Sequence, residues 1–155
     1  MRKSKNAKNS DFFWINMPAR KYKDLAESAL KEKRRVMEIV KSIPDSERTF
    51  ENTVQPIEYA SELVNTAWGT VYFLMNAKPA DSDRNLAKSA VDFIQAESLK
   101  LSYDENIYKA FVAFENKKPK LSGAEKKLFE DNILSYKLLG FGLPKIKRNL
   151  VKQKM

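Results

Sequence analysis

Apolar side chains recur every three or four residues along most of the sequence, and this spacing limits the folds that the chain can adopt. The clearest stripe runs from Ile57 to Leu74. Its period matches the 3.6-residue turn of an α-helix, whereas no segment alternates polar and apolar residues over the length of a strand. Only short connections separate the stripes. The sequence therefore predicts an all-α fold of five to six helices in an antiparallel bundle.

Two long helices are predicted in the N-terminal half. The first has Pro18 in its first turn, where a missing N–H is tolerated, and ends near Ser42. The second begins around Thr49–Asn52, where Gln55 follows Asn52 at the spacing of a capping box. Because this second helix is the most hydrophobic one, we expect it to be the most buried.

Capping residues mark three further helices. We expect their starts at Asp81 or Ser82, at Ser102 with Glu105, and at Ser122 with Glu125. Gly140 suits the left-handed residue that closes the fifth helix, and Pro144 suits the first turn of a sixth. The pattern of that sixth helix still runs at Met155, so we expect a single helical domain over residues 16–155 that is truncated at its C-terminal end. Residues 1–15 are expected to form a basic mobile arm.

The sequence contains neither cysteine nor histidine. Their absence excludes disulfides, thiolate metal sites, the Ser–His–Asp triad and the common zinc sites. Glu58 and Glu62 form one acidic i, i+4 pair, which does not by itself make a metal centre. Gly140 and Gly142 fail the GxGxxG pattern because position 145 is lysine. We therefore assign no catalytic, cofactor-binding or metal-binding residue.

The positive charge is concentrated at the two ends of the chain. Residues 1–48 and 116–155 are basic, whereas residues 49–115 contain 10 acidic and 5 basic side chains. This arrangement lacks the basic, aromatic face of a typical nucleic-acid reader, so binding of nucleic acid is not the expected role. The longest nearly uncharged stretch, 63–77, is too short to span a membrane. With no cysteine to indicate an oxidising compartment, we expect a cytoplasmic protein.

Two sequence blocks resemble a known family. Residues 49–58 read TFENTVQPIE, which is similar to the T-F-E-N-T-x-x-P-L-E entry to a long helix in the thimet oligopeptidase, oligopeptidase A and neurolysin family of zinc metallopeptidases. Residues 139–144 read LGFGLP, followed by Arg148, and resemble that family's L-x-G-I-G-L-P-x-x-x-R corner. The similarity extends over about residues 45–150.

The resemblance implies a role as well as a fold. In this family the matched segment is the N-terminal helical part of a much longer, two-lobed protein built around a channel for short peptides. Zinc is held by an H-E-x-x-H motif in the C-terminal lobe, and no position of this sequence can correspond to it because histidine is absent. The chain is thus expected to be non-catalytic, to shape the channel wall, and to have as partners a C-terminal catalytic half, which carries the zinc, and short peptides.

Two alternatives remain open at this stage. A stand-alone basic helical module could bind an acidic partner or nucleic acid, and would then form a closed bundle without a large apolar patch. Alternatively, a helical protein could associate with itself through an apolar face. A wall domain should instead expose a contiguous apolar patch where its partner binds.

Overall fold

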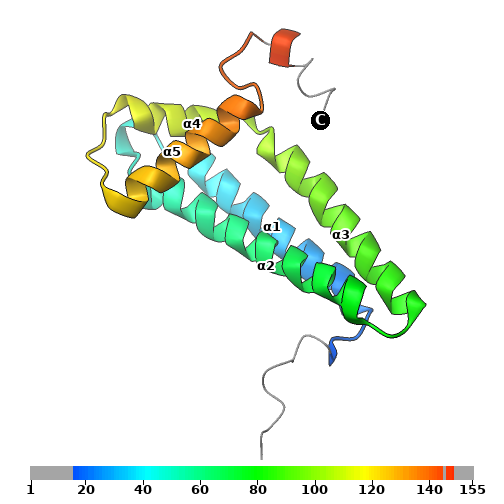
Figure 1. Ribbon diagram of the computed structural model, residues 1–155. Coiled ribbons are helices and arrows are strands. Elements are labelled where there is room, and N and C mark those ends of the chain that lie inside the picture. The colour runs from blue at the N-terminus through cyan, green and yellow to red at the C-terminus, as the bar shows by residue number, and fades with distance from the viewer. Residues whose placement is uncertain (1–15, 145, 149–155) are drawn as a thin grey trace, which may run out of the picture.

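A computed structural model describes residues 16–144 and 146–148 (Figure 1). Its elements are α1 (Lys21–Ser42), the 3-10 turn η2 (Asp45–Glu47), the π-helical turn η3 (Phe50–Val54), α2 (Gln55–Ala77), α3 (Asp81–Ser102), α4 (Glu105–Asn116) and α5 (Gly123–Leu138). No strand occurs within the described residues. The prediction of an all-α fold is therefore confirmed.

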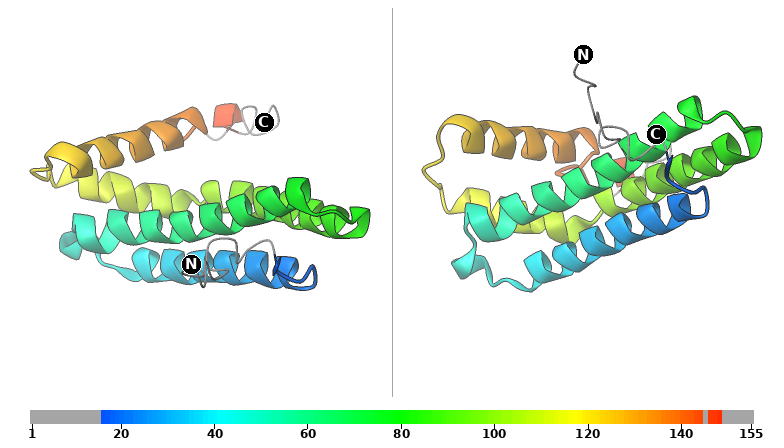
Figure 2. Two further views of the ribbon diagram at one scale, coloured as in Figure 1. Left: turned by 60° about the horizontal axis from the view of Figure 1, so that its bottom comes forward. Right: turned by 90° about the horizontal axis from the view of Figure 1, so that it is seen from below.

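The three longest helices, α1, α2 and α3, pack against one another and run side by side (Figure 2). The shorter helices α4 and α5 form a hairpin at the end of the bundle where α1 ends and α2 begins (Figure 1). There α4 packs against α1 and η3. Successive long helices run in opposite directions, as the short connections between them predict.

The buried apolar side chains form two clusters. The long-helix core comprises Tyr22, Ala26, Leu30, Val64, Ala67, Val71, Leu74, Ala87, Ala90, Val91 and Ile94. The hairpin core comprises Met37, Val40, Phe50, Val54, Ile57, Ile107, Ala110, Phe111, Phe114, Phe129 and Ile133. Leu101 lies at the margin of both clusters. Both α1 and α2 contribute to each core and join the two halves of the molecule.

The first helix begins later than expected. The backbone N–H of Lys21 donates to the carbonyl of Pro18 at 2.8 Å, so Pro18 lies in a turn that precedes α1. Pro18 is therefore not in the first helical turn, and Arg20 occupies the N-cap position. The predicted end at Ser42 is confirmed, because Ile43 has extended backbone angles.

Several predicted caps are wrong because a cap depends on backbone angles as well as on residue type. Ala80, which is extended, is the N-cap of α3 in place of Asp81 or Ser82. Ser102 is the last residue of α3, and the carboxylate of Asp104 caps α4 instead. Ser122 occupies the N-cap position of α5 as predicted, but its side chain forms no capping hydrogen bond.

The end of α5 follows the sequence prediction. Gly140 has a φ of 88°, which a residue with a Cβ adopts only with strain. Its N–H donates to the carbonyl of Lys137 at 2.9 Å, and the N–H of Phe141 donates to that of Tyr136 at 3.1 Å. This pair of bonds is a Schellman motif. Residues 146–148 are helical, and the rest of the predicted sixth helix lies outside the described residues, as does the predicted arm over 1–15.

Candidate functional site

The segment before α2 is organised by the amide of Asn52. Its Oδ1 accepts the backbone N–H of Thr49 at 2.8 Å, and the Thr49 hydroxyl accepts the backbone N–H of Asn52 at 3.3 Å. The same Oδ1 accepts the hydroxyl of the fully buried Thr53, while Nδ2 donates to the carbonyl of Glu47. The capping box is thus Thr49 with Asn52, not Asn52 with Gln55 as the sequence spacing suggested. These contacts explain the TFENT block as a structural corner.

Arg48 and Lys117 hold the adjoining loop. Arg48 is buried, and its guanidinium donates to Asp45 at 2.8 Å and to the carbonyl of Val40 at 3.0 Å. The ammonium of Lys117, at the end of α4, donates to the carbonyls of Ser46 and Arg48. The entry to α2 is therefore fixed to both α1 and α4.

The corner after α5 is built around Phe141. This buried ring lies 4.9 Å from the ring of Tyr108 and 5.6 Å from that of Tyr136, measured between centroids. The guanidinium of Arg148 lies 5.1 Å from the Phe141 centroid and pairs with Glu105 at 2.7 Å. Both blocks that carry the family resemblance thus position helices, and neither places a reactive group in a cavity.

The acidic side chains do not form a metal site in the described part of the chain, where no three His, Cys, Asp or Glu residues come together as ligands would. The carboxylate of Glu62 accepts a long hydrogen bond from the hydroxyl of Thr66, at 3.5 Å. Glu58 acts electrostatically on Lys33, which lies on the inward stripe of α1 between Leu30 and Met37. Burial lowers the pKa of Lys33, and the charge of Glu58 opposes this effect.

Lys33 borders a small pocket beside the hairpin core. The pocket has a volume of about 150 Å³ and also contacts Ser61, Ser102, Asn132 and Tyr136. The hydroxyls of Ser61 and Ser102 donate to backbone carbonyls of their own helices. Burial raises the pKa of Tyr136, and the charges of Asp104 and Glu58 add to that rise, so the phenol stays protonated. Apolar side chains such as Met37 and Ile57 line much of the pocket, and the described residues around it include no reactive pair.

Large exposed apolar side chains occur on α1, α2, α3 and α5 and after α5, and α2 carries the largest group of them. Tyr59, Leu63, Tyr72 and Phe73 each leave roughly half or more of their side chain accessible, from 46% for Tyr72 and Phe73 to 67% for Tyr59. Among the described helices α2 still contributes the most buried residues, six, so the expectation that it is the most buried helix is confirmed even though part of its surface is apolar and exposed. Its high hydrophobicity arises because apolar residues occur on its solvent face as well as on its core face. Such a surface on a helix is typical of an interaction site.

A groove between α1 and α2 continues this surface. It has a volume of about 680 Å³ and is bordered by Leu25 and Ala29 of α1, by Leu63 and Ala67 of α2, and by polar and charged side chains of both helices. We call it the α1–α2 groove. Leu25 and Ser28 also border a second cavity of about 480 Å³, the N-terminal pocket, which lies against residues 16–18. Leu25 and Ser28 thus form a shared border of the groove and the pocket.

The aromatic residues of the sequence divide between core and surface. Tyr22 is buried, and Tyr108 and Tyr136 pack in the aromatic corner. Tyr59 and Tyr72 are exposed on α2, although Tyr72 stacks on Trp68 with centroids 4.9 Å apart. Leu63 of α2 and Leu86 of α3 follow the helical spacing of the apolar stripes in the sequence, yet each is 51% exposed. Both residues lie at the edge of an apolar stripe, and helical periodicity alone does not distinguish the edge of a stripe from its buried centre.

Comparison with known proteins relates this fold to one family. The sequence matches the family model for the neurolysin/thimet oligopeptidase N-terminal domain over residues 25–148. It is also similar to oligopeptidase A of Haemophilus influenzae, with 26% identity over 102 residues, which is 64% of this chain. The aligned region is 15% of that protein, so the chain spans a small part of the relative's length.

Proposed function

The chain belongs to the neurolysin/thimet oligopeptidase family and matches its N-terminal domain. Because of this match, we propose that the chain is a non-catalytic domain that forms part of the channel wall of a zinc oligopeptidase. In this role it lines part of the channel that admits short peptides. The peptide bond is cleaved in a catalytic region that this chain does not supply. We further propose that the assembly acts in the cytoplasm.

One observation carries this proposal. The family match extends over residues 25–148, most of a sequence that contains neither histidine nor cysteine. Zinc in proteins is bound mainly by imidazole, thiolate and carboxylate groups. The described acidic residues do not gather in threes, so the residues present do not fit a catalytic zinc ion. Any zinc-dependent step of the reaction is therefore proposed to take place outside this chain.

Two features of the fold are consistent with a structural role in a larger protein. The Asn52 and Phe141 corners fix the ends of α2 and α5 through contacts within the domain. The solvent face of α2 and the α1–α2 groove provide apolar surface for a neighbouring domain. In the described residues no helix is both long enough and apolar enough to cross a bilayer.

The proposal is tested with the purified chain and a catalytic partner. Alone, the chain should neither hydrolyse a fluorescence-quenched short peptide with zinc added nor bind zinc in a calorimetric titration. Mixed with an oligopeptidase A that lacks the region matched by this chain, it should restore hydrolysis of the peptide. Hydrolysis by the chain alone would overturn the non-catalytic role. Failure of the mixture, with both components folded and associated, would overturn the wall role.

A further inference from the structure

The residues that lead into the N-terminal pocket have an unusual composition. Phe12, Phe13, Trp14 and Ile15 are four large apolar residues in succession, and they follow the polar, basic stretch 1–11. The family match begins at residue 25, so it does not account for this run. The next residue, Asn16, is itself part of the pocket wall.

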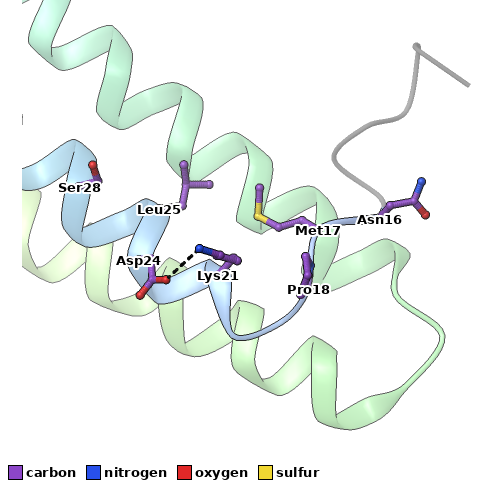
Figure 3. Close-up of a pocket in the computed structure, with 7 residues that line it drawn as sticks. All are labelled: Asn16, Met17, Pro18, Lys21, Asp24, Leu25 and Ser28. Atoms are coloured by element: carbon purple, nitrogen blue, oxygen red, sulfur yellow. Dashed lines mark ion pairs between the residues drawn. The ribbon is translucent and has the colours of Figure 1, made fainter.

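The N-terminal pocket offers apolar surface directly beside that point. Met17 and Pro18 form one side, and Leu25 of α1 forms the floor, where Met17 and Leu25 point toward the ribbon of α2 (Figure 3). Lys21 and Asp24 at the rim form an ion pair with each other at 3.9 Å (Figure 3). Because the two charges are paired, an apolar group entering the pocket leaves no isolated charge without a partner.

We propose that the occupant of the N-terminal pocket is the chain's own segment Phe12–Ile15. The pocket volume of about 480 Å³ lies within the range of about 300–1,000 Å³ typical of ligand sites and can take aromatic side chains. Asn16 tethers the segment at the pocket wall, so binding is intramolecular and competes well with free partners. The occupied pocket would extend the apolar surface of the α1–α2 groove through the shared residues Leu25 and Ser28.

Tryptophan fluorescence tests this inference directly. The chain has two tryptophans, so Trp68→Phe leaves Trp14 as the sole indole reporter. In this background we expect emission from Trp14 at shorter wavelength than from free indole. If the docked form outnumbers the undocked form by about ten to one, the quenching constant of Trp14 with acrylamide should fall by up to about tenfold. Circular dichroism would establish that each variant remains helical.

A second substitution separates the pocket from other binding places. Ser28 is exposed at the pocket, so Ser28→Arg fills the cavity without touching the core and should return Trp14 to the emission and quenching of free indole. Ser42→Arg, on the exposed far end of α1, is the matched control and should leave Trp14 protected.

Three results would overturn the inference. The first is that Trp14 in the Trp68→Phe variant emits and is quenched like free indole. The second is that Trp14 stays protected from acrylamide after Ser28→Arg. The third is that this protection appears only as the protein concentration rises. The third would identify a second copy as the occupant. None of these readouts involves zinc or peptide hydrolysis, so they fail or succeed separately from the proposed function.

Discussion

The amide of Asn52 and the hydroxyl of Thr49 cap each other's backbone N–H groups across the entry to α2, at 2.8 and 3.3 Å. The same amide bonds Thr53 and the carbonyl of Glu47. One side chain therefore satisfies polar groups in the loop, in the cap and in the buried part of η3. Because so many hydrogen bonds meet at Asn52, substitution of this residue is the sharpest test of how the segment 49–58 is held.

Asn52→Ala should lower the free energy of unfolding by about 2 kcal/mol, because it removes a cap and leaves the buried Thr53 hydroxyl without its acceptor. Thr49→Ala should cost about 1 kcal/mol, since it removes only one capping bond. Urea denaturation measures both. Gln55→Ala is the control and should change the value by less than about 0.5 kcal/mol. A cost for Gln55→Ala equal to that of Asn52→Ala would contradict the observed cap.

Helix periodicity predicted the helical class and several boundaries, including Ser42 and Gly140. It missed the caps at Ala80 and Asp104, because Ser102 and Asp81 have suitable side chains but helical backbones. The π-helical turn η3 was also missed. Its extra residue per turn is set by the bonds of Asn52 and by packing of Phe50 and Val54 in the hairpin core, which no local pattern encodes.

Trp68→Phe should change the free energy of unfolding by less than about 1 kcal/mol. The indole N–H of Trp68 is buried and finds no hydrogen-bond partner among the described residues, so removing it relieves a desolvated donor while some apolar contact is lost. The stacking on Tyr72 can be retained by a phenyl ring. Thermal unfolding measures the change, and Trp68→Ala, which loses the ring, should cost about 3 kcal/mol or more.

Lys33→Met should raise the free energy of unfolding by about 1 kcal/mol. Lys33 forms no hydrogen bond or ion pair with another residue in ranges 16–144 and 146–148, and burial lowers its pKa, so its charged form is less stable in the fold than in water. Methionine keeps a similar length and fills the pocket edge. Chemical denaturation measures the gain, and the exposed Lys31→Met serves as control, with almost no change expected. A loss of stability would show that Glu58 stabilises Lys33 more than burial penalises it.

Glu97 should contribute to stability above pH 4.5 and lose that contribution in acid. Lys100 and then Arg34 lower the pKa of its carboxyl through hydrogen bonds and charge, with Lys100 at 2.5 Å and Arg34 at 2.6 Å. The folded state therefore favours the carboxylate, and the contribution disappears as pH falls through the lowered value. At pH 7 the Glu97→Gln variant should therefore have a lower melting temperature than the unchanged protein. Near pH 3 the two melting temperatures should converge.

Glu62→Gln is the control for this pH dependence, because Glu62 has no ion pair among the described residues. Its effect should be small at every pH. A difference in melting temperature between Glu97→Gln and the unchanged protein that stays constant down to pH 3 would contradict the predicted titration. Raising the salt concentration should shrink the difference at pH 7, since Arg34 and Lys100 remain partly exposed.

The interaction surface was only partly foreseeable. The apolar side chains of α2 are visible in the sequence, but whether Leu63 faces the core or the solvent depends on how α1 and α3 pack against α2. The sequence led to the expectation of an exposed apolar patch through the family resemblance, whereas Tyr59 and Phe73 were not identified as members of it. The N-terminal pocket was not anticipated, because its walls come from a turn and a helix face that only the fold brings together.

The division of the interior into two clusters has a mechanical consequence. At the layer between them α1 contributes Lys33, α2 contributes the small Ala60, and α3 contributes Ser98, whose buried hydroxyl has no hydrogen-bond partner in the described part of the chain. A layer with so little interlocking resists bending less than the layers on either side. Force applied to the α4–α5 end should therefore be taken up as flexure halfway along the long helices, which leaves the opposite end undistorted.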